Sequence, residues 1–456
     1  MKVLTVVLCV CALCWPATTI RAQKPDQADG LPDLNALIED RHAPENAGPA
    51  LTLDEVERMA LARNPEIAVA VRRVVMAEAS VPAAGALDDP ELMYRGWGVP
   101  LSQPWNYNAA QNMFMVTQAL PGPGKRSLRT SVANSDVAEA KDELAGTRLR
   151  VRVEVGKAFY GLLSAQDELR VHDEHVAIAR QAIEAARIRY TVGQVPQQDL
   201  LKAQLGLTRL GEHMIRFDRD VEVARAQLNT LVGRDPAASL EVRGDYGLVA
   251  PLPSAASLEQ LALQSRPDLL AAEAAVEKSR RQQSLAKKAY VPDFTASAGY
   301  MLMPSGSTTR NDYMLEGSMT LPWLNHRKHD ADIAEADSAV TEQDAELAAM
   351  RTAAFGQIQE SLAEARAAQK FAALYQDSLR PQAEATLHAA VIAYENNQTD
   401  FLNLLDSQMA VVDIQLAAIQ AMGDFSMRMS DLELAVGAPI DPTQPAAATS
   451  AQEGQQ

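Results

Sequence analysis

The stretch Gln118-Ala119-Leu120-Pro121-Gly122-Pro123-Gly124-Lys125-Arg126 separates two different kinds of sequence. Before it, segments such as Met113 to Thr117 are apolar and suit a β-strand. After it, a helical pattern runs from about Arg126 to Arg189 without a proline. A helix of about 65 residues would be ~95–100 Å long at 1.5 Å per residue. Because helices in globular domains average about 11–12 residues, this length predicts long helical hairpins instead of a globular core.

The same succession returns about 200 residues later, which is the signature of an internal repeat. The corresponding segments are Asn64-Pro65-Glu66 with Arg266-Pro267-Asp268, Leu120-Pro121 with Leu321-Pro322, and Leu200-Leu201 with Leu404-Leu405. The pattern predicts two copies of one unit. The expected organisation is a signal peptide (1–22), an N-terminal extended segment (23–50), a first repeat (51–234), a linker (235–254), a second repeat (255–438) and a disordered C-terminal tail (439–456).

Each repeat is expected to contain the same elements in the same order. These are an opening helix (52–84 and 255–289), a β-hairpin region (91–119 and 293–320), a long helix (126–189 and 328–393), a turn and a shorter return helix (199–231 and 403–435). The return helix is about half as long as the outgoing one, so the opening helix could supply the other half by stacking end to end. The predicted fold class is therefore mainly α with a small β part.

Composition limits the function. The chain has 456 residues and a formal net charge of −17, which argues against a nucleic-acid binder.

The first 22 residues are typical of a secretory signal peptide, with a charged start at Met1-Lys2, an apolar stretch from Val3 to Trp15 and a small residue, Ala22, at the end. All three cysteines lie inside that segment, so the mature chain would have no disulfide or thiol site. Lipidation of Cys14 is disfavoured because the preceding Leu13 is not small.

The two hairpin regions are rich in aromatic residues and poor in charge. Tryptophan and tyrosine collect at membrane interfaces, although an ordinary small sheet with an aromatic core would look similar. The candidate interface aromatics are Trp97, Trp105, Tyr107, Tyr300, Tyr313 and Trp323. No apolar run of about 18 residues is present, so no membrane-spanning helix is expected. Two hairpins give four strands, and an open sheet edge is not tolerated in lipid. Three chains sharing one barrel would give twelve strands, within the range seen for such barrels.

The duplicated unit resembles the TolC-type outer-membrane efflux proteins over essentially the whole mature chain. The resemblance is carried by Gln118 to Arg126, by Tyr190-Thr191-Val192-Gly193 with Asp199-Leu200-Leu201, and by Leu228 to Gly233. It implies a homotrimer with a twelve-stranded barrel in the outer membrane and a long periplasmic α-barrel. It also implies a periplasmic adaptor and an inner-membrane pump, most often of the RND type, as partners. The first motif is most similar to members tied to heavy-metal cation efflux.

Carried over by motif, the resemblance implies a channel gate at the helical tips. The carboxylate-ring positions fall at Asn403 and Asp406, and Asp400 could substitute for the carboxylate that Asn403 lacks. A ring of carboxylates in a narrow pore would attract cations. The competing interpretation is that Asp199, Asp400 and Asp406 are acids favoured at helix starts by the helix dipole.

The links that would hold neighbouring helices closed involve Tyr394 and Thr399 on one hairpin and Gln198 and Asp199 on the other. Since Thr399 lacks the basic group of a salt bridge, a hydrogen bond between Tyr394 and Asp199 is favoured. The tip residues are candidates for contact with the adaptor: Gly193, Gln194, Val195, Asn397 and Gln398.

Other candidates are better explained by structure than by chemistry. His172 and His175 have helical spacing and could ligate a metal, but a solvated pair is favoured because no third ligand is near in sequence. Methionines cluster in the hairpins and could bind Cu(I), but apolar packing is favoured. No catalytic motif is present, so an enzyme, a cofactor and a bound metal are not expected. Alternatives to an efflux duct are a type I secretion duct for peptides or proteins and a periplasmic helical rod.

Overall fold

The computed structural model describes residues 49–99, 101–193, 196–247, 251–304, 306–307, 311–396 and 398–440, without the side chains of Tyr107 and Ala182. The predicted signal peptide lies outside the described residues, as do nearly all of the N-terminal segment and residues 441–456 of the predicted tail.

The two halves of the chain contain the same series of elements. The first half has α2 (Leu53–Arg63), α3 (Pro65–Gly85), β1 (Glu91–Trp97), the 3₁₀ turn η1 (Tyr107–Ala109), β2 (Gln111–Leu120), α4 (Lys125–Thr191) and α5 (Gln197–Val232). The second half has α6 (Ala255–Ser265), α7 (Pro267–Lys287), the 3₁₀ turn η2 (Lys288–Tyr290), β3 (Phe294–Leu302), β4 (Asp312–Met319), the 3₁₀ turn η3 (Pro322–Asn325), α8 (His326–Leu374), the π-helical turn η4 (Tyr375–Leu379), α9 (Arg380–Glu395) and α10 (Phe401–Val436). The predicted mainly helical fold with two β-hairpins is confirmed.

The opening helix of each half is broken, contrary to the prediction of one continuous helix. The breaks fall at Asn64 and Arg266, whose backbones are extended, and each is followed by a proline at the first position of the next helix. Proline has no N–H to donate, and it disfavours helical geometry in the residue before it. The return helices end against these breaks. Asn64 Nδ2 donates to the Leu231 carbonyl (3.0 Å), and Arg266 Nη1 donates to the Ala435 carbonyl (2.9 Å).

The long helix of the first half is continuous over 67 residues, which corresponds to ~100 Å. Its counterpart, predicted as one helix from 328 to 393, consists of α8, η4 and α9. The π-helical turn ends two residues before Pro381, which cannot donate a hydrogen bond to the preceding turn and would clash with the carbonyl of Asp377. Local widening of the helix accommodates that proline.

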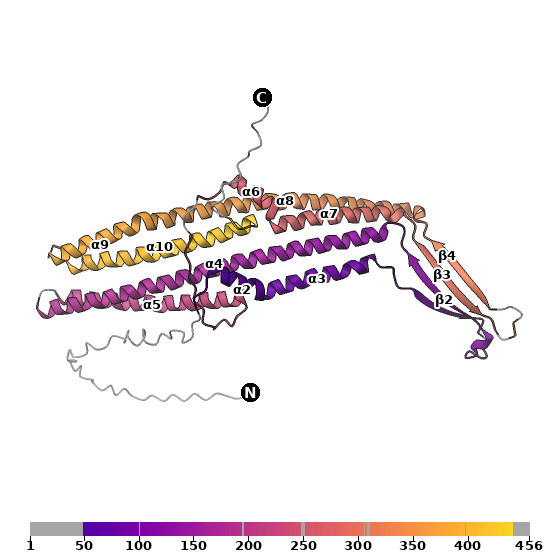
Figure 1. Ribbon diagram of the computed structural model, residues 1–456, viewed down its shortest axis with the longest axis horizontal. Helices are drawn as coiled ribbons and strands as arrows, with labels where there is room; N and C mark the ends of the chain where they lie inside the picture. Colours follow the sequence, from indigo (N-terminus) through magenta and orange to yellow (C-terminus); the bar gives the residue numbers. More distant parts are fainter. Residues whose placement is uncertain are drawn as a thin grey trace, which may run out of the picture. The chain divides into compact units, whose positions relative to one another are not determined.

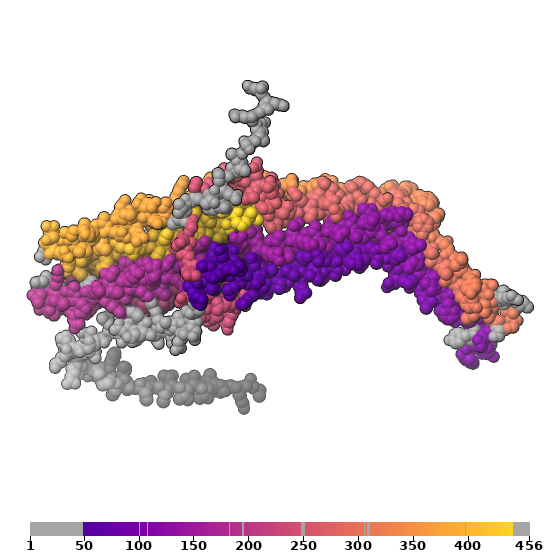
Figure 2. Space-filling model, in the orientation of Figure 1, coloured from indigo at the N-terminus to yellow at the C-terminus, as the bar shows by residue number. Residues whose placement is uncertain are grey.

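The helices pack as pairs along α4. This helix contacts α3 and α5 from its own half and α7 and α10 from the other half. Figure 1 shows α4 beside α5 and α9 beside α10, and Figure 2 shows the first half, indigo to magenta, lying along the second, orange to yellow. α10 is the one helix in the described ranges that is long and apolar enough to cross a membrane by length and composition, and it packs against α4, α8 and α9.

The four strands form one antiparallel sheet in the order β1-β2-β3-β4. Both predicted hairpins are present, and they join through β2 and β3, so residues from the two halves pair directly. In Figure 1 the strands extend beyond one end of the helices.

The stretch Gln118 to Arg126, which separates strand from helix in the sequence, also holds the junction between the sheet and the helices. The Lys125 ammonium pairs with the Asp293 carboxylate (2.8 Å), and the Gly122 N–H donates to the same oxygen (2.7 Å). Gly124 begins α4 with φ +86°, a conformation that glycine adopts at little cost. The motif of the first half therefore binds the start of β3 in the second half.

Candidate functional site

The helical tips bring the two halves together at the end of the molecule that carries the predicted gate. α4 and α5 are joined by a short turn in which Gly193 has φ +74°, and Gln398 lies exposed in the turn between α9 and α10. The predicted tip residues Gln194, Val195 and Asn397 lie outside the described residues.

The acids near the tips have different roles in local structure. Asp400 caps α10, because its carboxylate accepts a hydrogen bond from the Asn403 N–H (3.0 Å). Asp199 lies in the first turn of α5, where a negative charge is favoured by the helix dipole. Asn403 and Asp406 are both exposed and three residues apart on α10, so they lie on one face of the helix. Asp406 is therefore free of the capping role that engages Asp400.

Within a single chain, Tyr394 joins the two hairpins by its ring, and the hydrogen bond to Asp199 stays a prediction. Among the described residues of a single chain, these two side chains make no hydrogen bond with each other. Instead, the Arg189 guanidinium of α4 lies 4.4 Å from the centre of the Tyr394 ring on α9, a cation–π contact between the halves. The Thr399 hydroxyl accepts from Asn403 Nδ2 (3.1 Å), and Gln198 is exposed.

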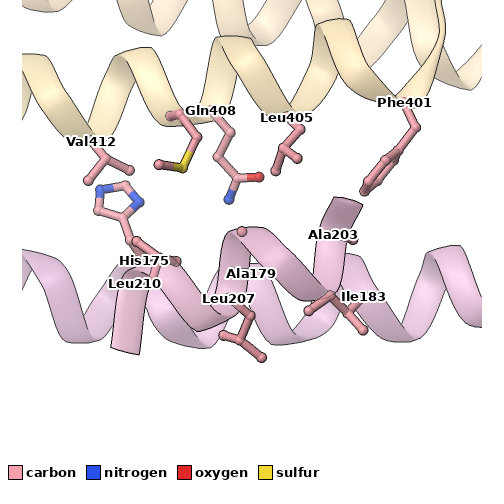
Figure 3. A pocket seen from close by; sticks show the side chains of 12 residues that line it. His175, Ala179, Ile183, Ala203, Leu207, Leu210, Phe401, Leu405, Gln408 and Val412 are labelled. Atoms are coloured by element: carbon pink, nitrogen blue, oxygen red, sulfur yellow. The ribbon is translucent and has the colours of Figure 1, made fainter. Parts of the chain in front are cut away.

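A small apolar cluster lies behind this contact. Phe401 packs near Tyr394, with ring centres 5.9 Å apart, and is buried with Ala186 of α4 and Ala203 of α5. A cavity of about 20 Å³, large enough for one water, continues from this cluster along the seam between the two hairpins. In Figure 3, apolar side chains of α4 and α5 face Phe401, Leu405, Gln408 and Val412 of α10.

The interpretation of His172 and His175 as a solvated pair is wrong. Both are buried, because α4 is covered by α5 on one side and by α10 on another. His172 Nε2 is 2.7 Å from the Leu210 carbonyl of α5, and His175 Nε2 is 2.8 Å from the Gln415 side-chain oxygen of α10. They connect three helices. In the described ranges, no group of three His, Cys, Asp or Glu residues is arranged to hold a metal ion.

One face of the sheet is apolar and exposed. The register places one aromatic residue of each strand in a single row: Tyr94, Phe114, Tyr300 and Tyr313. The next row on the same face, two residues along each strand, is Leu92, Val116, Ala298 and Leu315. A third apolar row, Leu120, Phe294 and Met319, lies ~20 Å from the aromatic row, six residues along β3. Apart from Ala298, all of these side chains have large exposed apolar surfaces. This face is therefore an apolar band with aromatic residues at both ends, and Gln118, opposite Ala296, is the polar side chain between its end rows.

The predicted interface aromatics occupy different parts of the sheet region. Tyr300 and Tyr313 belong to the aromatic row, with ring centres 5.3 Å apart. Trp105 is exposed in the loop after β1, and Trp323 is exposed in η3 at the opposite end of the sheet. Trp97 ends β1 on the opposite face. The Tyr107 side chain lies outside the described residues.

The opposite face is polar and rich in methionine. One of its rows is formed by Glu91, Thr117, Ser297 and Glu316, and the hydroxyls of Thr117 and Ser297 lie 3.0 Å apart. An apolar face opposite a polar face is the alternation typical of a transmembrane β-barrel strand.

The sequence indicates the tip, but nothing in it singles out Arg189. Its partner Tyr394 lies in the other half of the chain, and no spacing rule relates positions so far apart. The only signal was indirect: a cation near the end of one long helix and an aromatic residue near the end of its counterpart.

Comparison with known proteins gives consistent matches. The model of the family described as "Outer membrane efflux protein" matches residues 56–234 and 258–438. The cobalt-zinc-cadmium resistance protein CzcC of Cupriavidus metallidurans is 23% identical over 396 residues, which cover 86% of this chain and 91% of that protein. The pyoverdine export outer membrane protein OpmQ of Pseudomonas aeruginosa is 23% identical over 84% of this chain and 83% of that protein. A crystal structure of CusC aligns with a TM-score of 0.72 and 16% identity over 87% of this chain and 96% of that chain.

Proposed function

Because the chain belongs to the outer membrane efflux protein family, we propose that it is the exit channel of a tripartite efflux system. Substrates would pass from an inner-membrane pump, through a periplasmic adaptor, into this duct and out of the cell. The observation that carries the proposal is the match of the family model to both halves, together with a sheet whose one face is an exposed apolar band. This is a family of channels and not of enzymes.

The channel is proposed to be a homotrimer. In one chain the sheet has two unpaired edges, β1 and β4, and four strands are too few to close a barrel in lipid. Three chains would pair these edges and form a twelve-stranded barrel with the apolar band toward outer-membrane lipid. The helical hairpins of the three chains would form the periplasmic α-barrel.

The gate is proposed to lie at the tips, with Asp406 as its cation-attracting group and Asn403 and Asp400 beside it. Support comes from the exposure of Asp406 on the face of α10 that it shares with Asn403. The Asp406→Ala channel should lose part of its cation preference and its block by divalent cations in single-channel recordings. Unchanged selectivity and block would remove Asp406 from the gate.

The tip residues Gly193, Gln194, Val195, Asn397 and Gln398 are the proposed contacts for the adaptor, and an RND-type pump is the proposed energy source. A turn at the end of two packed helices is a place where a second helical hairpin could dock.

The proposed cargo is a heavy-metal cation, supported by the similarity to CzcC over most of both chains. The test is deletion of the gene, followed by challenge of the strain with cobalt, zinc and cadmium and, side by side, with organic antibiotics. Sensitivity to metals alone, restored by the intact gene, is the expected result. Sensitivity to organic compounds alone would overturn the metal assignment. A mature chain that is soluble and monomeric without detergent would overturn the channel itself.

A further inference from the structure

The segment between β4 and α8 extends the exposed apolar band beyond the end of the sheet. Along β4 the band is formed by alternate residues up to Met319, and Leu321 continues this alternation. The residue between them still forms a strand-type hydrogen bond to the residue before β3 (2.9 Å). The chain then turns through η3, where Trp323 and Leu324 are 51% and 73% exposed. Large apolar side chains are therefore presented outward directly beyond the band.

The distance along β4 fits the apolar layer of a membrane. Tyr313, in the aromatic row, and Leu321 are eight residues apart in sequence, which is ~26 Å along an extended strand. The apolar band of a transmembrane barrel is about 25 Å tall and is flanked at both interfaces by aromatic residues. Trp323 follows Leu321 by two residues, so it lies at the edge of that layer, where tryptophan is favoured.

Two basic residues follow at the start of α8. His326 is the first residue of this helix, and Arg327 and Lys328 lie in its first turn, which contains no acid. Both residues are exposed, and within the ranges that the structure describes neither side chain forms an ion pair or a hydrogen bond. Since the N-terminal end of a helix carries a partial positive charge, two such cations are unfavourable there. An anion outside the chain would remove this cost.

The equivalent segment of the first repeat uses the same positions for contacts within the chain. Gly122 stands where the second repeat has Trp323, and its N–H donates to the Asp293 carboxylate (2.7 Å). Arg126 stands where the second repeat has Arg327, and its guanidinium donates to a carbonyl at the end of α3 (Nε to O, 2.8 Å). The second repeat presents an aromatic ring and a cation outward at these positions. The difference indicates that this segment contacts something outside the chain.

We propose that this segment binds the anionic phospholipids of the membrane leaflet next to the helices. Leu321, Trp323 and Leu324 enter the outer part of the acyl layer, where the tryptophan ring is apolar and its N–H reaches the headgroups. Arg327 and Lys328 pair with the lipid phosphates. Each basic residue near an anionic membrane surface favours binding by about fivefold. The inference rests on the proposed function for the direction in which the apolar band faces.

Trp323 can itself report which lipid lies beside it. In the variant Trp97→Phe, Trp105→Phe it is the one tryptophan of the mature chain, since Trp15 lies in the predicted signal peptide. The mature protein is reconstituted into phosphatidylcholine vesicles with brominated phosphatidylglycerol, which is anionic, or with brominated phosphatidylcholine. Bromine quenches the fluorescence of a tryptophan that it contacts. Phosphatidylglycerol should quench Trp323 more strongly, with a relative association constant of about tenfold or more.

Removal of the two bases should abolish this lipid preference. Arg327→Gln with Lys328→Gln, in the same background, should be quenched equally by both lipids, because the apolar side chains still hold Trp323 in the bilayer. The matched control is Arg72→Gln with Arg73→Gln, which removes two adjacent exposed bases in the middle of α3 and should keep the preference.

The inference is wrong if Trp323 shows no preference between the two lipids, or if the preference survives the loss of both bases. It is equally wrong if neither lipid quenches Trp323, because protein, such as a second copy of the chain, then covers this segment. If the variant without the two bases fails to assemble, the salt dependence decides. The preference should shrink between about 0.05 and about 0.5 M KCl, and an unchanged preference overturns the inference.

Ion conduction, measured in planar bilayers of the same lipids, separates this result from the proposed function. Conduction without a preference for phosphatidylglycerol would keep the channel and remove this lipid site. A preference without conduction would keep the lipid site and remove the channel.

Discussion

Glu168 is a carboxylate buried where three helices meet. It lies on α4 with only 9% of its surface exposed, near Asp220 of α5 and Gln420 of α10. Burial raises the pKa of Glu168 to about 7. The hydrogen bond from the Gln420 side chain opposes this shift, and the charge of Asp220 adds to it. The folded protein therefore holds a proton at pH 6 that the unfolded chain, with a pKa near 4.5, has released.

The pKa of Glu168 predicts that stability falls as pH rises. Below pH ~4.5 the group is protonated in both states, and between ~4.5 and ~7 folding becomes less favourable as the unfolded chain ionises. The loss is at most about 3 kcal/mol per chain, and about 1–2 kcal/mol with solvent screening. Glu168→Gln should remove this loss, so its thermal midpoint should exceed that of the wild type at pH 8 and equal it near pH 4.5. Circular dichroism in detergent measures both.

The matched control for Glu168 is Glu174→Gln, an exposed glutamate further along the same helix. It should leave the pH profile unchanged. Some pH dependence of the same sign remains in Glu168→Gln, because burial also raises the pKa of Glu57 and of Glu433. If the two variants have identical profiles, Glu168 does not carry the effect.

At the tips, the residue types predicted local roles such as helix capping, but they did not predict which side chains of the two halves contact each other. Aspartate is favoured at a helix start, and Asp400 is indeed the N-cap of α10. The contact between Arg189 and Tyr394 depends on how two hairpins from different halves pack, which local sequence does not encode. The burial of His172 was hidden for the same reason, since it depends on α5 and α10 covering α4.

At the level of elements, the lengths and the order of the helices and strands were predictable from the sequence, but the breaks within the helices were not. The 67-residue helix and both hairpins follow from periodicity and proline spacing. Pro65 and Pro267 were available as signals for the broken opening helices, but a proline at the first helical position also starts a helix.

The predicted linker packs against the first half of the chain instead of only connecting the two halves. Val242 forms a parallel bridge with Leu51, and the Tyr246 hydroxyl donates to Asp167 (2.8 Å).

The junction motif yields a prediction at the same level. A Cβ at Gly122 would lie 2.5 Å from the Pro292 carbonyl oxygen, so Gly122→Ala must displace the backbone before β3. The displacement would weaken the hydrogen bond from Gly122 N–H to Asp293. We expect a loss of about 2 kcal/mol or more, seen as a lower thermal midpoint and less assembled protein in the membrane.

Gly161→Ala is the control for this glycine. It lies within α4 with no neighbouring atom within 4 Å of the added methyl group, and alanine favours helix over glycine by about 1 kcal/mol. Its midpoint should stay unchanged or rise. If Gly122→Ala and Gly161→Ala have the same thermal midpoint, then the close approach of the Pro292 carbonyl does not restrict the residue at position 122.

For the whole molecule, the two faces of the sheet decide where the protein resides. Leu315 and Glu316 are adjacent on β4, yet Leu315 is 84% exposed in the apolar band and Glu316 lies on the polar face. In a single chain the band is a contiguous apolar surface facing water, and such surfaces mark sites that contact a membrane or another protein. In the proposed trimer it faces lipid, and the polar face lines the pore.

The neighbouring positions Leu315 and Glu316 allow a paired test of this orientation. Leu315→Lys places a charge in the middle of the band, between the two rows that end it, at a cost of about 2–4 kcal/mol in each of three chains. The variant should lose its outer-membrane trimer, measured by membrane fractionation and by size-exclusion chromatography with light scattering. Glu316→Lys introduces the same side chain one residue later, toward water, and should assemble normally. If both variants assemble, or if only Glu316→Lys fails, then the apolar band does not face lipid and the proposed barrel is wrong.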